Sequence, residues 1–386
     1  MSDPLLVALS VAPLVGWLYL LAGRGGFWLA RPRDDQAPAP PAAWPSIVAV
    51  IPARDEADVI GRAVASLLAQ DYPASLQVIV VDDQSADGTA ARARDAGAAA
   101  GASSRLQVVA GSAPPAGWTG KLWAQSQGVA RATELKPDYL LLTDADIEHA
   151  PGAVRALAAR AAGADLVLAS LMVELSCETW PERLMIPAFV FFFQMLFPFA
   201  WAADPRRSTA AAAGGCMLVR REALARAGGL QAIRGKIIDD CALAALLKAQ
   251  GPIWLGLSRR AKSLRPYRSL AEIGRMISRS AYAQLRYSPW LLAGTLVGMA
   301  LIYLAPPLLA AFAPGAARWA GAAAWTLMAV AFQPTLRLYR RSALWGLALP
   351  AIGALYALFT VDSAVQVWRG RGGMWKGRAQ ALAEQA

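Results

Sequence analysis

The chain has 386 residues, 56% of them hydrophobic, and its mean hydropathy of +0.36 is high for a protein that lies wholly in water. Its net charge of +11 suits an anionic partner, and because the basic residues cluster beside apolar segments, we expect lipid headgroups and no nucleic acid. His149 is the only histidine, and the three cysteines lack metal-ligand spacing. A three-histidine zinc site is therefore excluded, and carboxylates must carry the chemistry.

The N-terminus predicts a membrane anchor over residues 1–30. Residues 4–22 form a nearly uncharged apolar run of spanning length, and the arginines after it indicate that this end is cytoplasmic. A cleaved signal peptide is the alternative, but Asp3 stands where such a peptide carries basic residues. Residues 31–45 are rich in Pro and Ala and predict an extended linker.

Residues 46–289 alternate short apolar runs with helical patterns. We predict buried strands at 47–51, 77–81, 106–109 and 139–143, and helices at 59–70 and 87–100. This order predicts an α/β domain with a Rossmann-like, mostly parallel sheet covered by helices. Such sheets bind ligands beyond the carboxyl ends of their strands, so the polar residues there are the candidate site.

Acidic residues follow the first two predicted strands. The first group is Pro52-Ala53-Arg54-Asp55-Glu56. Its acids can accept hydrogen bonds from ribose hydroxyls, although a solvated helix start explains them equally well. The second group begins with Asp82 and Asp83, where a carboxylate can bind the imino hydrogen of a uracil ring. Helix capping does not explain two consecutive acids at this position.

The fourth predicted strand runs directly into Asp144 and Asp146. Extended backbone sends residues i and i+2 to the same side, so the two carboxylates converge. Hard oxygen ligands suit Mg²⁺ or Mn²⁺. Water molecules and the phosphates of the substrate would complete the coordination of the ion. A polar turn is the alternative, but two acids beside a buried strand repel each other unless a cation is present.

Two further segments carry candidate residues. Lys121, on the glycine-containing loop that begins at Gly117, is a candidate diphosphate ligand. Asp239 and Asp240 precede a predicted helix, and one of them can act as a general base that takes the proton of an acceptor hydroxyl. An acidic cap at the helix N-terminus is the competing explanation.

The remaining apolar segments predict contact with a membrane. Residues 183–201 are aromatic-rich and contain two prolines, which suits an element at the lipid headgroup level; a buried core helix is the alternative. The stretches 290–313, 316–336 and 343–361 predict a C-terminal membrane module at 290–368, followed by a basic tail at 369–386. If each stretch crosses once, the tail breaks the positive-inside rule, so the number of crossings stays open.

Over about residues 46–289, these motifs in this order resemble the family 2 glycosyltransferases with the GT-A fold. The resemblance implies a metal-dependent, inverting transfer of a sugar from a nucleotide diphosphate donor, expected to be a UDP-sugar. The donor-binding residues it implies are Pro52, Arg54, Asp55, Glu56, Asp83, Lys121, Asp144, Gly214 and Gly215. It makes Asp144 and Asp146 the ligands of Mg²⁺ or Mn²⁺, and Asp240 the base beside Asp239. Asp55 replaces the family's usual asparagine.

The layout of the chain and its Trp375-Lys376-Gly377-Arg378 segment are similar to the hopanoid-associated glycosyltransferases of the HpnB type. This narrower resemblance implies a triterpenoid or similar lipid acceptor, at the bacterial inner membrane, with the catalytic domain in the cytoplasm. The acceptor side is expected near Tyr282, Gln284, Arg286 and Tyr287. The segment that begins at Gln284 is one residue short of the QxxRW motif of processive enzymes, so polymer synthesis is not expected.

Several alternatives remain open from the sequence. The acceptor can instead be a polyprenyl phosphate or a ceramide-like lipid. From another class, the chain can be a non-catalytic membrane protein that binds nucleotide sugars, or a subunit of a lipid transporter. The sugar and the oligomeric state are not determined by the sequence.

Overall fold

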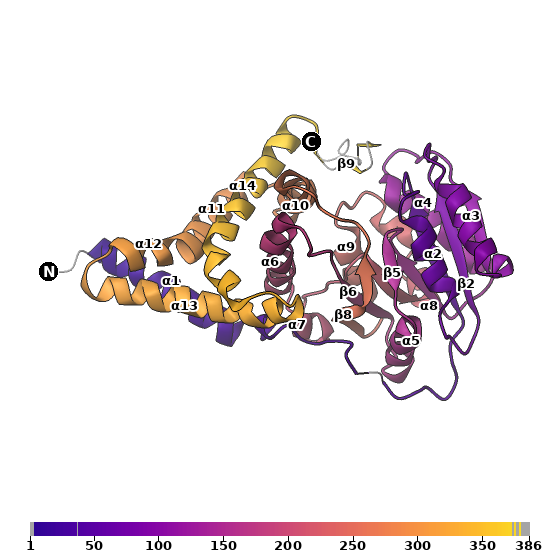
Figure 1. Ribbon diagram of the computed structural model, residues 1–386, viewed down its shortest axis with the longest axis horizontal. Coiled ribbons are helices and arrows are strands. Elements are labelled where there is room, and N and C mark those ends of the chain that lie inside the picture. The colour runs from indigo at the N-terminus through magenta and orange to yellow at the C-terminus, as the bar shows by residue number, and fades with distance from the viewer. Residues whose placement is uncertain (1–3, 37, 373, 376–377, 380–386) are drawn as a thin grey trace. The chain divides into compact units, whose positions relative to one another are not determined.

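The computed structural model describes residues 4–36, 38–372, 374–375 and 378–379, so most of the predicted basic tail, including Lys376 and Gly377, lies outside the described residues. The chain forms two compact units that are interleaved in sequence (Figure 1). The sheet unit comprises Pro32–Ser176 and Trp201–Arg265, and the helical unit comprises the residues up to Arg31, Cys177–Ala200 and Pro266–Gly372.

The sheet unit is built on one eight-stranded sheet. Its strands are β1 Ile47–Ala53, β2 Leu76–Asp82, β3 Leu106–Ala110, β4 Tyr139–Thr143, β5 Ile147–His149, β6 Leu168–Glu174, β7 Cys216–Arg220 and β8 Ile253–Ser263, in the order β3-β2-β1-β4-β7-β6-β8-β5. All four predicted strands are confirmed. The sheet is mixed: the pairings β3-β2, β2-β1, β1-β4 and β6-β8 are parallel, as the prediction of a mostly parallel sheet expects. The exceptions, which the sequence did not predict, are β7, which runs antiparallel to both β4 and β6, and β5, which runs antiparallel to β8.

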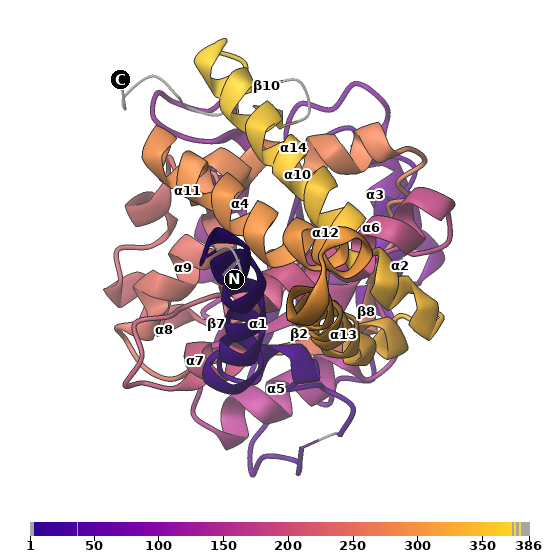
Figure 2. The same ribbon diagram turned by 90° about the vertical axis from the view of Figure 1, so that its left-hand side faces the viewer.

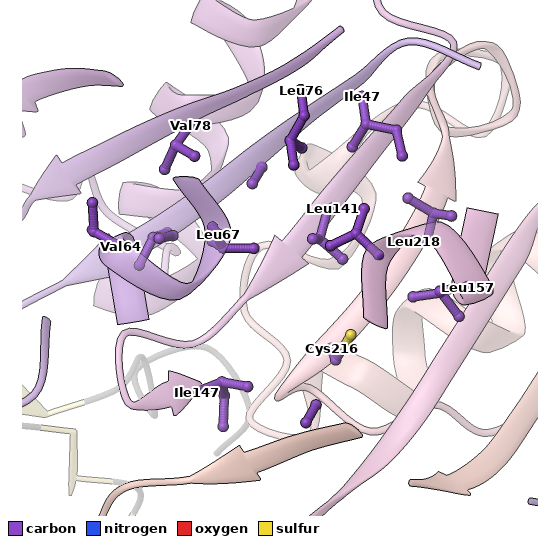
Figure 3. Packing of buried hydrophobic residues seen from close by; sticks show 14 of the residues in the cluster. Ile47, Val64, Leu67, Leu76, Val78, Leu141, Ile147, Leu157, Cys216 and Leu218 are labelled. Carbon is purple, nitrogen blue, oxygen red and sulfur yellow. The ribbon is translucent and has the colours of Figure 1, made fainter. Parts of the chain in front are cut away.

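Helices cover both faces of this sheet. They are α2 Ile60–Leu68, α3 Thr89–Ala99, α4 Gly120–Glu134, α5 Ala153–Gly163, α8 Arg221–Arg226 and α9 Asp239–Lys248. One face buries Ile47 and Leu141 together with Val64 and Leu67 of α2 (Figure 3). The residues that alternate with these along the strands pack against α4 and α9 on the opposite face. Burial on both faces explains why the strands are continuous apolar runs in the sequence.

The helical unit consists mainly of long apolar helices. They are α1 Pro4–Gly23, α6 Trp180–Leu196, α10 Leu270–Gln284, α11 Pro289–Met299, the π-helix η4 Ala300–Leu304, α12 Ala305–Phe312, α13 Gly315–Leu338 and α14 Leu349–Trp368. Figure 2 views α1 and α13 nearly end-on, with α14 lying across them. Trp17 of α1 is fully buried in their common core, and its indole Nε1 donates to the carbonyl of Ile302 in the π-helix at 3.0 Å.

Two helices of the described residues are long and apolar enough to cross a membrane, Pro289–Phe312 and Ala343–Trp368. They coincide with two of the three predicted C-terminal stretches. The third stretch lies in α13, which is not among these candidates, and the described N-terminal helix Leu9–Gly23 is apolar but shorter. The crossing of the N-terminal segment therefore stays a prediction.

The segment predicted at 183–201 forms most of α6, and it belongs to the helical unit. Phe191 and Phe192 are buried there, and Phe191 packs against Phe332 of α13 with ring centroids 5.2 Å apart. The chain before α6 is fixed by Glu182, which accepts hydrogen bonds from the backbone N–H groups of Thr179 and Tyr267 at 2.8 and 2.7 Å. The predicted catalytic domain at 46–289 thus shares two of its segments, 177–200 and 266–289, with the helical unit.

Candidate active site

The candidate site lies in the sheet unit, at the edge where β1, β2 and β4 end. Because β7 is antiparallel to β4, its first residue, Cys216, pairs with Thr143, the last residue of β4. This register brings Gly214 and Gly215 beside Asp144, whose N–H lies 3.4 Å from the Gly215 carbonyl oxygen. Two motifs that are far apart in the sequence therefore meet at one edge.

Lys121 is the central cation of the site. It stands in the first turn of α4, where the Thr119 side chain caps the helix. Its Nζ lies 2.8 Å from Oδ1 of Asp144 and 3.6 Å from Oδ2 of Asp239. Burial opposes the charge of Lys121, but the two aspartates outweigh it and raise the pKa of the lysine. The structure thus brings Lys121 together with Asp144 and Asp239, while its role toward a diphosphate stays a prediction.

Asp240 begins α9 and faces Gly214. Its Oδ2 accepts from the Gly214 N–H at 3.0 Å, and its Oδ1 accepts from the Cys241 N–H at 2.7 Å. Burial and the charge of Asp239 raise the pKa of Asp240 to about 6, against these hydrogen bonds and Lys121. A Cβ at Gly214 would lie 3.4 Å from the Lys121 Nζ and 3.5 Å from the Asp240 Oδ2, so a larger side chain here would fill the space between the ammonium group and the Asp240 carboxylate.

Asp146 is held by two residues at the end of β8. Its Oδ2 accepts from Oγ of Ser263 at 2.9 Å and from Nε of Arg265 at 3.3 Å. The same guanidinium donates from Nη2 to Oε1 of Glu56 at 2.6 Å and so joins the ends of β1, β4 and β8. Burial opposes the charge of Arg265, but Asp146 and Glu56 raise its pKa.

The two aspartates fit a divalent cation that also binds a phosphorylated ligand. Asp144 uses Oδ1 toward Lys121 and Asp146 uses Oδ2 toward Ser263 and Arg265, while the hydrogen bonds of the described residues leave the other oxygen of each carboxylate available. In metal sites, ligating carboxylates are oriented in this way by second partners. No group of three or more acidic, histidine or cysteine side chains that could hold a metal occurs among the described residues. Two carboxylates leave coordination positions for diphosphate oxygens and water, as Mg²⁺ prefers.

The residues predicted to bind the nucleoside lie at the neighbouring strand ends. Pro52 is buried in β1, and Arg54 donates from Nη1 to the Asp83 carbonyl oxygen at 2.6 Å. The Asp83 carboxylate is 0% exposed and lies 3.8 Å from the same Nη1. Asp55 accepts from the Ala86 N–H at 2.9 Å, which joins the two loops. Contact of Asp83 with a uracil ring stays a prediction.

The predicted acceptor-side residues lie in the helical unit. Tyr282 is buried near the end of α10, with its ring 5.7 Å from the ring of Tyr287, and Gln284 is the last residue of that helix. Arg286 follows in a left-handed backbone conformation with φ of 53° and is exposed. Their role toward an acceptor stays a prediction.

Sequence reasoning missed Arg265 and Ser263. The signal that identified the other residues, a polar side chain directly after a buried strand, also marks this position. It was missed because β8 carries charged residues at its end, among them Arg259, Arg260 and Lys262, and so lacks an uninterrupted apolar run.

Comparisons with known proteins bear on the family and the fold of the chain. A family model described as Glycosyl transferase family 2 matches residues 48–228. Among solved structures, a mannosyltransferase from Pyrobaculum calidifontis in complex with GDP-Man and Mn²⁺ is similar to the chain, with a TM-score of 0.55 and 21% identity over 94% of this chain and 99% of that chain.

Weaker similarity extends to two synthases. Mannosyl-3-phosphoglycerate synthase from Rubrobacter xylanophilus has a TM-score of 0.40 and 19% identity over 63% of this chain and 74% of that chain. Glucosyl-3-phosphoglycerate synthase from M. tuberculosis has a TM-score of 0.39 and 20% identity over 62% of this chain and 79% of that chain. No curated protein matches the sequence significantly. The comparisons therefore show a match of residues 48–228 to the glycosyl transferase family 2 model and a GT-A-like α/β fold with a mixed sheet.

Proposed function

We propose that the protein is a membrane-bound, inverting glycosyltransferase that moves a sugar from a nucleotide diphosphate donor, in the first place a UDP-sugar, to a hydroxyl group of a membrane lipid. The observation that carries the proposal is the convergence of Lys121, Asp144 and Asp240 around Gly214 at one sheet edge. Displacement of a diphosphate by a hydroxyl group requires positive charge near the leaving group, a carboxylate that can bind a metal ion, and a base that takes the proton of the hydroxyl. Lys121, Asp144 and Asp240 are groups of these three kinds.

Asp240 is the proposed general base. The acceptor hydroxyl loses its proton to Asp240 as its oxygen attacks the anomeric carbon, and the bond from that carbon to the diphosphate oxygen breaks. A pKa of about 6 lets the carboxylate be ionised at neutral pH and still accept a proton. A polyprenyl phosphate acceptor is already ionised and needs no such base, so the site favours a hydroxyl acceptor over that alternative.

Lys121 and Arg265 are the proposed cations near the leaving diphosphate. A Mg²⁺ or Mn²⁺ ion at Asp144 and Asp146 would neutralise the charge of the diphosphate. Lys121 holds Asp144 in place from one side, and Arg265 holds Asp146 from the other. Fixed groups of this kind stabilise developing charge without reorganisation during the reaction.

The exposed apolar surface of the helical unit supports a membrane location and a lipid acceptor. Trp290 is 86% exposed at the start of α11, and Phe312 is 80% exposed at the end of α12, although large apolar side chains normally leave water. Both belong to the spanning candidate Pro289–Phe312. Within this location we propose a hopanoid-type lipid as acceptor, at a bacterial inner membrane with the sheet unit in the cytoplasm.

Purified protein mixed with labelled UDP- or GDP-sugars, Mn²⁺ and extracted bacterial lipids tests the proposal. We expect a labelled lipid whose formation is lost in Asp240→Asn and also when hopanoids are omitted. Asp95→Asn, an exposed carboxylate on α3, is the matched control and should retain activity. Donor binding without any labelled lipid would indicate a non-catalytic nucleotide-sugar-binding protein, and label only on polyprenyl phosphate would refute the hydroxyl acceptor.

A further inference from the structure

One face of α10 is basic and exposed. The helix buries Ile273 and Ile277 in the core of the helical unit, and its opposite side exposes Arg275 and Arg279. These two are four residues apart and so lie on one helix face. Arg268, just before α10, and Arg286, just after it, are also exposed. We call these four residues the α10 arginine face.

The charges of this face are not balanced by nearby acids. Among the described residues, none of its four guanidinium groups forms a salt bridge. Glu272 is the only acid of α10, and one of its carboxylate oxygens accepts from the Arg268 backbone N–H at 2.8 Å. Asp362 is the acid of the packed helix α14, and it accepts from Gln366. The face therefore suits an anionic ligand outside the protein.

The end of α10 lies beside the ends of two apolar helices. The ring of Tyr282 packs edge-on against Trp368, the last residue of α14, at 5.8 Å between centroids. Ser278 of α10 donates to the Phe359 carbonyl of α14 at 3.0 Å, and α11 begins at Pro289, shortly after α10. Figures 1 and 2 both show α10 alongside α14.

Exposed tryptophans and arginines occur together at the start of α11 and the end of α14. Trp290 at the start of α11 and Trp368 at the end of α14 are 86% and 60% exposed. Arg369 and Arg371, directly after Trp368, are exposed as well. Tryptophan is enriched at membrane–water interfaces, and basic residues flank spanning helices on the cytoplasmic side. The apolar helices thus end where the arginines begin.

We propose that the α10 arginine face binds the anionic headgroups of phospholipids, so that α10 lies in the headgroup layer with its arginines toward lipid phosphates. This inference rests on the membrane location in the proposed function and adds a lipid specificity to it. Each arginine near an anionic membrane surface contributes about 1 kcal/mol, which corresponds to roughly a fivefold preference. The contribution is electrostatic and falls as salt rises.

The test uses the full chain reconstituted in phosphatidylcholine vesicles that contain spin-labelled phosphatidylglycerol or spin-labelled phosphatidylcholine. Electron paramagnetic resonance measures the lipid fraction that the protein immobilises. We expect a preference for phosphatidylglycerol that decreases with salt and falls about fivefold or more in Arg275→Gln/Arg279→Gln. Arg92→Gln/Arg94→Gln, two exposed arginines of α3 in the sheet unit, is the matched control and should keep the preference.

The outcomes separate the two proposals. Immobilised lipid without a phosphatidylglycerol preference would overturn the inference and leave the membrane location intact. Absence of any immobilised lipid would instead contradict the membrane location itself. A preference that persists in Arg275→Gln/Arg279→Gln would overturn the assignment to α10. Loss of the preference on addition of soluble glycerol phosphate would identify a site for free phosphate rather than for headgroups, and would also overturn it.

Discussion

The raised pKa of Asp240 makes a quantitative prediction for the pH dependence of activity. A general base must be ionised to accept a proton, so activity should fall as the pH drops through the pKa of the base. With a pKa of about 6, roughly one tenth of Asp240 is ionised at pH 5. With the ordinary value of 3.8, more than about nine tenths would be ionised at that pH. The two cases differ about tenfold in rate at pH 5.

The assay is kcat/KM for labelled sugar transfer between about pH 4.5 and 8, with saturating Mn²⁺. Asp239→Asn removes the like charge that raises the pKa of Asp240. The acidic limb of the profile of kcat/KM against pH should therefore move to lower pH in this variant. Lys121→Met removes an opposing cation and should move the limb to higher pH. Asp240→Asn should lower kcat about 10²- to 10⁴-fold. The reasoning is refuted if the native limb lies near pH 4, or if Asp240→Asn turns over at close to the native rate.

Three further variants test the site and the packing. Arg265→Ala should weaken Mn²⁺ binding in the presence of a nucleoside diphosphate by about 10- to 100-fold, measured by titration with electron paramagnetic resonance. Arg265→Lys should restore part of the affinity. An unchanged affinity in Arg265→Ala would show that Arg265 does not belong to the metal site. Gly128→Ala places a Cβ 2.4 Å from Cγ1 of Val50 and should lower the free energy of unfolding by about 1–3 kcal/mol, which is measured as a lower Tm. Gly163 has open space around it, so Gly163→Ala is the control and should not lower the Tm. Glu182→Ala leaves the part-buried backbone N–H groups of Thr179 and Tyr267 without their acceptor and should cost about 1–3 kcal/mol; a native Tm would contradict the view that Glu182 fixes the chain before α6.

The sequence predicted the parts of the sheet that are buried on both faces. β1, β2 and β4 are continuous apolar runs because helices cover both sides, and acids stand at or shortly after the end of each strand. Asp144 and Asp146 were predicted as a pair because two acids beside a buried strand repel each other without a cation. Lys121 and Asp239 were predicted from other patterns, and the structure places both close together with Asp144, while their chemical roles stay predictions.

Other parts could not be predicted because they depend on long-range partners. The direction of β7 is fixed by where the chain re-enters the sheet after α6, and no local pattern encodes it. The Asp83 carboxylate is buried and lies 3.8 Å from Arg54, a contact between two loops that the sequence does not show. The apolar side of α6 suits a membrane interface or a protein core equally well, and its packing against Phe332 decides where it lies in the fold.

The interleaving of the two units limits how the protein can be dissected. A fragment ending at residue 289 would keep α6 and α10 but lose α13 and α14, against which their apolar sides pack. Phe191 and Ile273 would then face water, and such a fragment should aggregate when expressed. A soluble catalytic fragment would instead need a short loop in place of residues 177–200. It would also have to end after Arg265, so that the ion pair between Arg265 and Asp146 is kept. Deletion series that shorten the chain from its C-terminus alone should therefore fail well before the active site is reached.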